Sequence, residues 1–211
     1  MASSSGLLCR LEDLKQELGI DSTNHVNDLS MELAIETAGQ EISDYCGREF
    51  VRATGQTRYY SAQHATCLLT DDILAITALR TDDDGNGSFE TTWSSTAYLL
   101  APFNAAAGVY PAPYTHLLVP SYSSGVFPCI SRGVQIVGDF GYATAVPPIV
   151  KKACLFQAAR SYRGGAAPFG TVGGRDFGQS FQSQGPENTA AIGLHPWVRR
   201  MLDPYRRRVI A

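Results

Sequence analysis

Residues 11–50 read LEDLKQELGIDSTNHVNDLSMELAIETAGQEISDYCGREF, and this stretch decides the fold. Leucines recur at helical spacing over residues 7–18, and Gly19 stands where a helix C-cap is expected. Asp21 and the polar residues after it offer N-caps for a second helix, which we expect over about residues 26–46. The stretch therefore predicts a short helix followed by a long one.

The long predicted helix carries two adjoining apolar stripes. One stripe is Val26, Leu29 and Leu33, and the other is Met31, Ile35, Ala38, Ile42 and Tyr45. A single stripe covers one partner, so two stripes predict that this helix contacts two elements at once. We therefore interpret it as the central helix of the fold.

The character of the sequence changes over about residues 50–140. Short runs rich in β-branched and aromatic residues alternate with Gly, Pro and Asp turn signals. They predict a twisted antiparallel sheet with a long hairpin insertion over about residues 80–130. Residues 82–87 resemble the start of an EF-hand loop, but Trp93 occupies the position of its terminal Glu and strands flank it, so a hairpin turn is favoured.

The helical pattern returns over residues 147–163, which begin with a Pro-Pro pair. Proline is tolerated in the first helical turn because the N–H groups there have no intrahelical partner. Residues 164–192 hold seven glycines and no hydrophobic period, so we expect a flexible segment there. A last short helix is expected after Pro196.

Together these patterns predict an α+β fold. It combines a small helical bundle around the long central helix, an antiparallel β-sheet with a hairpin insertion, and an extended C-terminal arm. Hydrophobic residues make up 44% of the chain and charged residues 18%, which is typical of a globular protein. We expect residues 1–192 to form a single domain and residues 193–211 to form a docking arm.

Charge is distributed unevenly along the chain. Residues 1–90 hold sixteen acidic and six basic side chains, whereas residues 91–211 hold four acidic and eleven basic ones. This polarity suits head-to-tail contacts in which the acidic part of one copy faces the basic part of another. It fits equally well with two charge sets that neutralise each other within one fold.

The sequence offers no candidate for catalysis. The four histidines are scattered without an i, i+4 pair, and no Gly-x-Ser-x-Gly motif occurs. The Gly-rich run over residues 170–178 lacks the strand, the helix and the Lys that a phosphate loop needs. We therefore expect no enzymatic activity, no cofactor and no bound metal.

Cysteine usage and hydropathy bear on the environment of the protein. Five cysteines without a Cys-x-x-Cys pair support neither a disulfide framework nor a zinc knuckle, which favours a reduced, cytosolic environment. No apolar run approaches the roughly 18 residues that span a bilayer, and the Ser-rich N-terminus lacks a signal-peptide pattern. We expect no membrane contact.

The C-terminal residues combine aromatic and arginine side chains. Arginine pairs bidentately with carboxylates, and Trp, Tyr and Arg are enriched at binding hot spots. We rank protein docking first, a solvated helix end second and nucleic-acid binding third, because the chain as a whole is acidic, with a pI of about 5.8. The docking candidates are Trp197, Arg199, Arg200, Tyr205, Arg206, Arg207 and Arg208.

Three segments together resemble the head-tail connector (adaptor) family of long-tailed double-stranded DNA bacteriophages. They are LEDLKQELGI at 11–20, EISDYCGREF at 41–50 and GDFGYATAVPPIVKKACLFQAARSYR at 138–163. The resemblance covers roughly residues 8–60 and 132–165, with a looser fit of the Arg-rich C-terminus. Its most characteristic parts mark turns and core packing, not chemistry.

This resemblance implies a structural virion protein. Such adaptors form a ring, here expected to hold twelve copies, below the portal protein at the capsid vertex. The ring extends the channel through which DNA passes without sequence recognition, and it receives a stopper or tail-completion protein on its other side. Family members dock on the portal through their C-terminal segment, here about residues 196–211. The resemblance places the protein in the host cytoplasm before assembly and in the virion neck afterwards.

Two other functions remain as alternatives. The first is another neck component, such as a stopper or tail-terminator subunit, for which we expect more β-structure and less of a helical framework. The second is a small nucleic-acid-binding regulator that uses the Arg-rich end.

Overall fold

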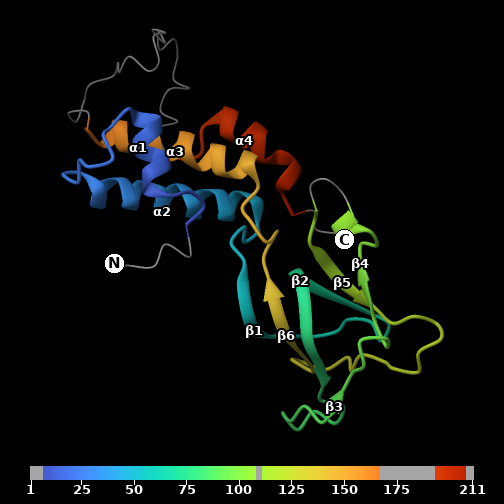
Figure 1. Ribbon diagram of the computed structural model, residues 1–211. Helices are drawn as coiled ribbons and strands as arrows, with labels where there is room; N and C mark the ends of the chain where they lie inside the picture. The colour runs from blue at the N-terminus through green and yellow to red at the C-terminus, as the bar shows by residue number, and fades with distance from the viewer. Residues whose placement is uncertain (1–6, 108–110, 167–192, 208–211) are drawn as a thin grey trace. The chain divides into compact units, whose positions relative to one another are not determined.

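The computed structural model describes residues 7–107, 111–166 and 193–207, and the chain divides into two compact units (Figure 1). The helical unit combines residues 1–47 with residues 148–211, and the β-unit comprises residues 48–147. The predicted α+β class is confirmed. The expected division into residues 1–192 and a docking arm over residues 193–211 stays a prediction.

The helical unit contains four α-helices in its described residues. They are α1 (Leu11–Leu18), α2 (Asp28–Cys46), α3 (Pro148–Ala166) and α4 (Pro196–Leu202), with a 3₁₀ turn η3 (Asp203–Tyr205) after the last. Gly19 and Gly47 end α1 and α2 in the left-handed conformation, with φ of 69° and 61°, which glycine adopts at little cost. None of the described helices is long and apolar enough to cross a membrane.

Only one of the two predicted stripes of α2 lies in the core. Met31, Ile35, Ala38 and Ile42 are buried, as are Ala153 and Ala158 of α3, the helix that packs on α2. In contrast, Val26, Leu29 and Leu33 are 86%, 81% and 62% exposed. The predicted contact of α2 with more than one element is confirmed, since α2 packs with α3, α1 and α4. The prediction that Val26, Leu29 and Leu33 form one of these contacts is wrong among the described residues.

A buried lysine fixes the connection between α1 and α2. The Lys15 ammonium lies 2.6 Å from a carboxylate oxygen of Asp28, at the first residue of α2, and donates to the backbone oxygens of Asn24 and Ser22 at 2.8 and 3.4 Å. His25 adds a second contact to Asp28 at 2.7 Å. The hydrogen bond from Lys15, and then that from His25, lowers the pKa of Asp28 below its ordinary value of 3.8.

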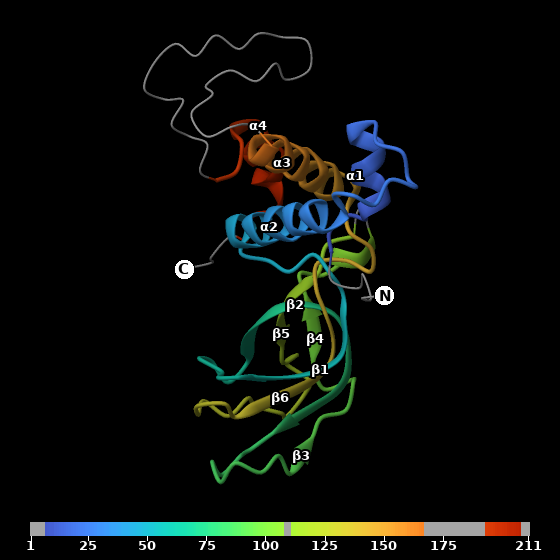
Figure 2. The ribbon, with the colours of Figure 1, turned by 90° about the vertical axis from the view of Figure 1, so that its left-hand side faces the viewer.

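The β-unit is built around one antiparallel sheet, which confirms the predicted sheet (Figure 2). Its strands are β1 (Ala53–Tyr60), β2 (Cys67–Thr81), β3 (Thr91–Thr92), β4 (Leu99–Ala101), β5 (Tyr114–Leu118) and β6 (Val134–Phe140). The order is β1-β6-β2-β5-β4, with β3 paired to β2, and a 3₁₀ turn η1 (Ala105–Ala107) follows β4. The predicted insertion over residues 80–130 thus supplies three strands to the same sheet.

The core of the β-unit lies where the longest strands meet. The alternating inward residues of β6 are Val134, Ile136, Gly138 and Phe140, and they pack with Ile73 and Leu79 of β2. Trp93 stacks on the buried ring of Phe127, with centroids 4.8 Å apart. Buried and half-buried residues alternate along β6, which is the pattern expected of a strand with one face in the core.

The Lys15–Asp28 pair predicts how stability depends on pH. The pKa of Asp28 is lower in the folded state than in the unfolded chain. Its ion pair therefore stabilises the fold above about pH 4, and this contribution is lost as the pH falls further. We expect Asp28→Asn to flatten the acid-induced loss of stability below pH 4. Urea unfolding followed by helical circular dichroism at pH 5 and pH 3 measures the effect. Equal losses in both proteins would contradict it.

Candidate docking surfaces on the helical unit

The described C-terminal residues are packed on their own helical unit. Leu194, Val198 and Leu202 are buried, with the last two fully inaccessible. His195 caps α4 by accepting the N–H of Trp197 on its Nδ1 at 3.2 Å, and Pro196 occupies the first helical turn. The predicted short helix after Pro196 is present as α4, and the described residues 193–207 pack on the helical unit because these three aliphatic side chains have a core to enter.

Gln157 of α3 holds the start of this segment in place. Its side-chain nitrogen donates to Glu41 of α2 at 2.8 Å and to the backbone oxygen of Gly193 at 3.3 Å. Its side-chain oxygen accepts the N–H of His195 at 3.2 Å. A buried amide with three partners costs little to desolvate and fixes geometry, so Gln157 links α2, α3 and α4.

Aromatic contacts continue the same attachment. Phe156, beside Gln157 on α3, meets the ring of Trp197 edge to face at 4.9 Å and the ring of His195 at 5.4 Å. Trp197 nevertheless stays 43% exposed. One edge of this indole is therefore held by the subunit while the rest is available to another molecule.

The end of the described chain folds onto the C-terminus of α2. The Tyr45 hydroxyl donates to Asp203 at 2.5 Å, and this bond raises the pKa of Tyr45. The Arg206 guanidinium lies 5.0 Å from the centre of the Tyr45 ring. The N–H of Arg207 donates to the backbone oxygen of Cys46 at 2.8 Å, which satisfies a carbonyl at the end of α2.

The predicted docking residues therefore fall into separate groups. Arg199 and Arg200 are exposed on α4 beside Trp197, whereas Tyr205 is half-buried in the turn after it. Arg206 and Arg207 are exposed at the end of the described chain, and Arg208 lies outside the described residues. Residues 167–192, which make up most of the segment predicted to be flexible, also lie outside the described residues. Portal docking by this set stays a prediction.

A second candidate docking surface lies at the N-terminal half of α2, and the sequence analysis did not predict it. We call Val26, Leu29 and Leu33 the α2 stripe. Next to it runs a groove of about 440 Å³ between α2 and the C-terminal half of α3. Its lining is Asn27, Ser30, Leu33, Ala34, Thr37, Ser161 and Tyr162. The stripe was visible in the sequence, but its exposure was not, because both stripes of the predicted helix are apolar.

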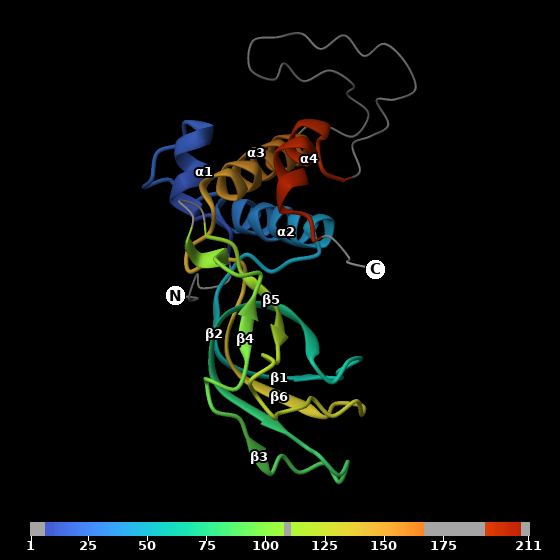
Figure 3. The same ribbon diagram turned by 90° about the vertical axis from the view of Figure 1, so that its right-hand side faces the viewer.

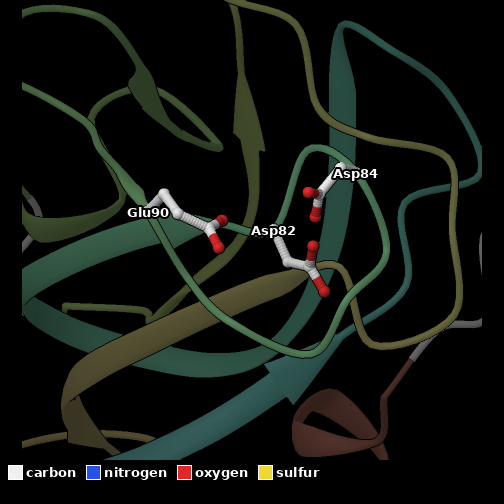
Figure 4. A group of neighbouring side chains, drawn as sticks. All are labelled: Asp82, Asp84 and Glu90. Atoms are coloured by element: carbon white, nitrogen blue, oxygen red, sulfur yellow. The ribbon is translucent and has the colours of Figure 1, made fainter.

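A cluster of carboxylates lies in the β-unit, at the turn between β2 and β3 (Figure 4). Oxygens of Asp82, Asp84 and Glu90 lie within 4.8 Å of one another. Asp82 accepts the backbone N–H groups of Gly85 and Gly87 at 2.7 and 2.8 Å. Burial alone raises its pKa, but these and neighbouring N–H donors outweigh burial and lower it. The carboxylate holds a hairpin turn, as the sequence predicted.

Comparisons with known proteins identify solved structures with a similar fold but no matching sequence family. No protein-family model and no curated protein matches the chain. Among solved structures, a chain in the neck of an empty gene transfer agent particle, computed with C6 symmetry, matches with a TM-score of 0.59. The sequences are 15% identical, and the match covers 100% of this chain and 95% of the other. The chain shares its fold with a gene transfer agent neck protein.

Two further structures agree. A chain in the neck of the native gene transfer agent particle, computed with C12 symmetry, matches with a TM-score of 0.56 and 16% identity over 100% of this chain and 94% of that one. A chain in the native gene transfer agent virion matches with a TM-score of 0.54 and 14% identity, covering 100% and 95%. The fold thus agrees with the resemblance to phage connectors drawn from the sequence.

The packing of α4 yields a stability prediction. Because Leu202 is fully buried, we expect Leu202→Ala to lower the free energy of unfolding of the helical unit by about 2–4 kcal/mol. Arg200→Ala, at an exposed site two residues earlier, should change it by less than about 0.5 kcal/mol. Urea unfolding followed by helical circular dichroism measures both. If α4 were a loose arm, the two variants would behave alike.

Proposed function

We propose that this chain is a structural subunit of the neck of a phage-like particle, where copies of it form a ring. The observation that carries the proposal is the shared fold, which extends over the whole chain and nearly the whole of each matched neck chain. Those necks were computed with C6 and C12 symmetry. A chain with the same fold is suited to the same kind of repeated, head-to-tail assembly.

The uneven charge distribution supports a ring. A heterologous contact joins two different surfaces, so each copy needs one surface of each kind. Helix α2 carries five acidic side chains and no basic one, whereas residues 196–207 carry four arginines and one aspartate. Opposite charges on separate parts of one subunit favour contacts between copies and speed their encounter.

Within the neck, we propose that the chain is the adaptor that sits between the portal protein and a stopper or tail-completion protein. The segments at residues 41–50 and 138–163, which resemble phage adaptors, support this assignment over a stopper or tail terminator. In this role a ring of twelve copies extends the DNA channel, and the protein acts without catalysis or cofactor. DNA passes through the ring without being recognised.

The portal contact is best assigned to the end of the chain. Trp197, Arg199 and Arg200 lie on a helix that is anchored to its own subunit. Arg206 and Arg207 are exposed and make the last described contacts to α2, at the Tyr45 ring and the backbone oxygen of Cys46, and Arg208 follows them in the sequence. Arginine clusters at a chain end pair well with carboxylates of a partner protein.

Incubation with the portal protein encoded alongside this chain tests the assignment. We expect negatively stained particles to show a ring on the portal. Changing Arg206, Arg207 and Arg208 to Glu should lower the number of attached copies at least about tenfold, because each change turns an attractive charge into a repulsive one. The control is Lys152→Glu, an exposed charge reversal on α3.

Two results would contradict this function. Unchanged attachment of the triple variant would remove the end of the chain from the portal contact. Rings that attach only to a completed tail, and never to the portal, would instead favour a stopper or tail-terminator role.

A further inference from the structure

The α2 stripe is an apolar surface that the described part of its own subunit does not cover. Leu29 and Leu33 lie one turn apart on α2, and Val26 lies in the turn just before the helix. The groove between α2 and α3 adjoins this set at Leu33. Single exposed aliphatic residues are ordinary on protein surfaces. Three in a row beside a groove are typical of an interaction site.

The groove has the size and lining of a site for one large side chain. Its volume is about 440 Å³, and its lining combines Leu33, Ala34 and Tyr162 with the polar residues Asn27, Ser30, Thr37 and Ser161. An aromatic residue with one polar atom fits this mixture, since its ring can lie on the apolar wall and its polar atom can reach a hydroxyl.

Charges around the stripe restrict the partner further. Glu32 and Glu36 are exposed and lie one turn apart on α2, on either side of Leu33 in sequence. The partner surface should therefore present an aromatic anchor with basic residues a few positions away.

Helix α4 carries that combination. Trp197 is 43% exposed and is fixed by Phe156, and Arg200 lies three residues later on the same side of the helix. Arg199 is also exposed. A pre-positioned Trp flanked by arginines is the composition most enriched at protein-binding hot spots.

The two surfaces lie at different places on the helical unit. Helix α4 and the turn after it contact α2 near its C-terminal end, through Tyr45 and Cys46 (Figures 1 and 3). Leu29 lies sixteen residues before Tyr45, which is about 24 Å along the helix. The surfaces are therefore placed to meet on different copies of the chain, which is the geometry of a ring contact.

We propose that the α2 stripe and its groove bind α4 of the neighbouring copy, with Trp197 seated in the groove and Arg199 and Arg200 facing Glu32 and Glu36. This contact rests on the proposed ring and names the surfaces that form it. In this proposal α4 binds the neighbouring copy of the chain, and the residues after α4 bind the portal protein.

Charge reversal with rescue tests the pairing. Glu36→Arg and Arg200→Glu are each introduced into the full chain, and particles are produced with the other components of the parental virus. We expect each single variant to lower the copies per particle at least about fivefold, because like charges then face each other. The double variant, which restores opposite charges, should recover to within about twofold of the parent. Glu17→Arg, an exposed reversal on α1, is the matched control.

A disulfide cross-link tests proximity directly. Leu29→Cys combined with Arg200→Cys, oxidised in assembled particles with copper phenanthroline, should give a ladder of linked copies on a non-reducing gel. Each single substitution retains the five native cysteines and should give no ladder. A ladder from the paired variant alone supports the contact, and its absence from particles that contain rings would overturn it.

The outcomes separate this inference from the proposed function. If normal rings form with both single charge variants, the inference fails while the ring stands, and the stripe then belongs to another neck protein. If single variants fail and the double variant is not rescued, the two surfaces do not face each other. If the unmodified chain never enters the neck, the proposed function fails, and this inference fails with it.

Discussion

The close packing of α2 against α3 is the interaction on which the helical unit depends. Buried residues of the two helices include Ala38 of α2 and Ala153 and Ala158 of α3, and small side chains of this kind allow packed helices to approach closely. The stripe of α2 that contains Ile35 is buried, whereas the α2 stripe (Val26, Leu29 and Leu33) is exposed. The contact also sets Phe156 and Gln157 of α3 where α4 can reach them. One packing choice therefore decides which surfaces the subunit offers.

Pre-formed surfaces suit a protein that must assemble quickly and in one arrangement. A flexible arm would lose conformational entropy on binding, whereas a helix already held by its own subunit has lost it during folding. Trp197 and the arginines of α4 are presented in this way, and Leu29 and Leu33 of the α2 stripe lie on a 19-residue helix.

The sequence predicted what depends on local chemistry and missed what depends on a partner's position. Gly19, the long helix and the antiparallel sheet follow from caps and periodicity, and the structure confirms them. Which stripe of α2 faces inward could not be predicted, since both stripes are apolar. For α4, the i, i+4 pair Val198 and Leu202 was visible, but the surrounding arginines favoured an arm. Burial of Lys15 and Gln157 arises from partners distant in sequence or in loops, which no local pattern marks.

Amide hydrogen exchange of the purified chain tests the central claim most directly, namely that α4 is part of the folded helical unit. The account predicts that amides of residues 200–202 are protected at least about 100-fold relative to an unfolded chain, alongside those in the middle of α2 and α3. Exchange of residues 200–202 at the unprotected rate, while α2 and α3 remain protected, would contradict it.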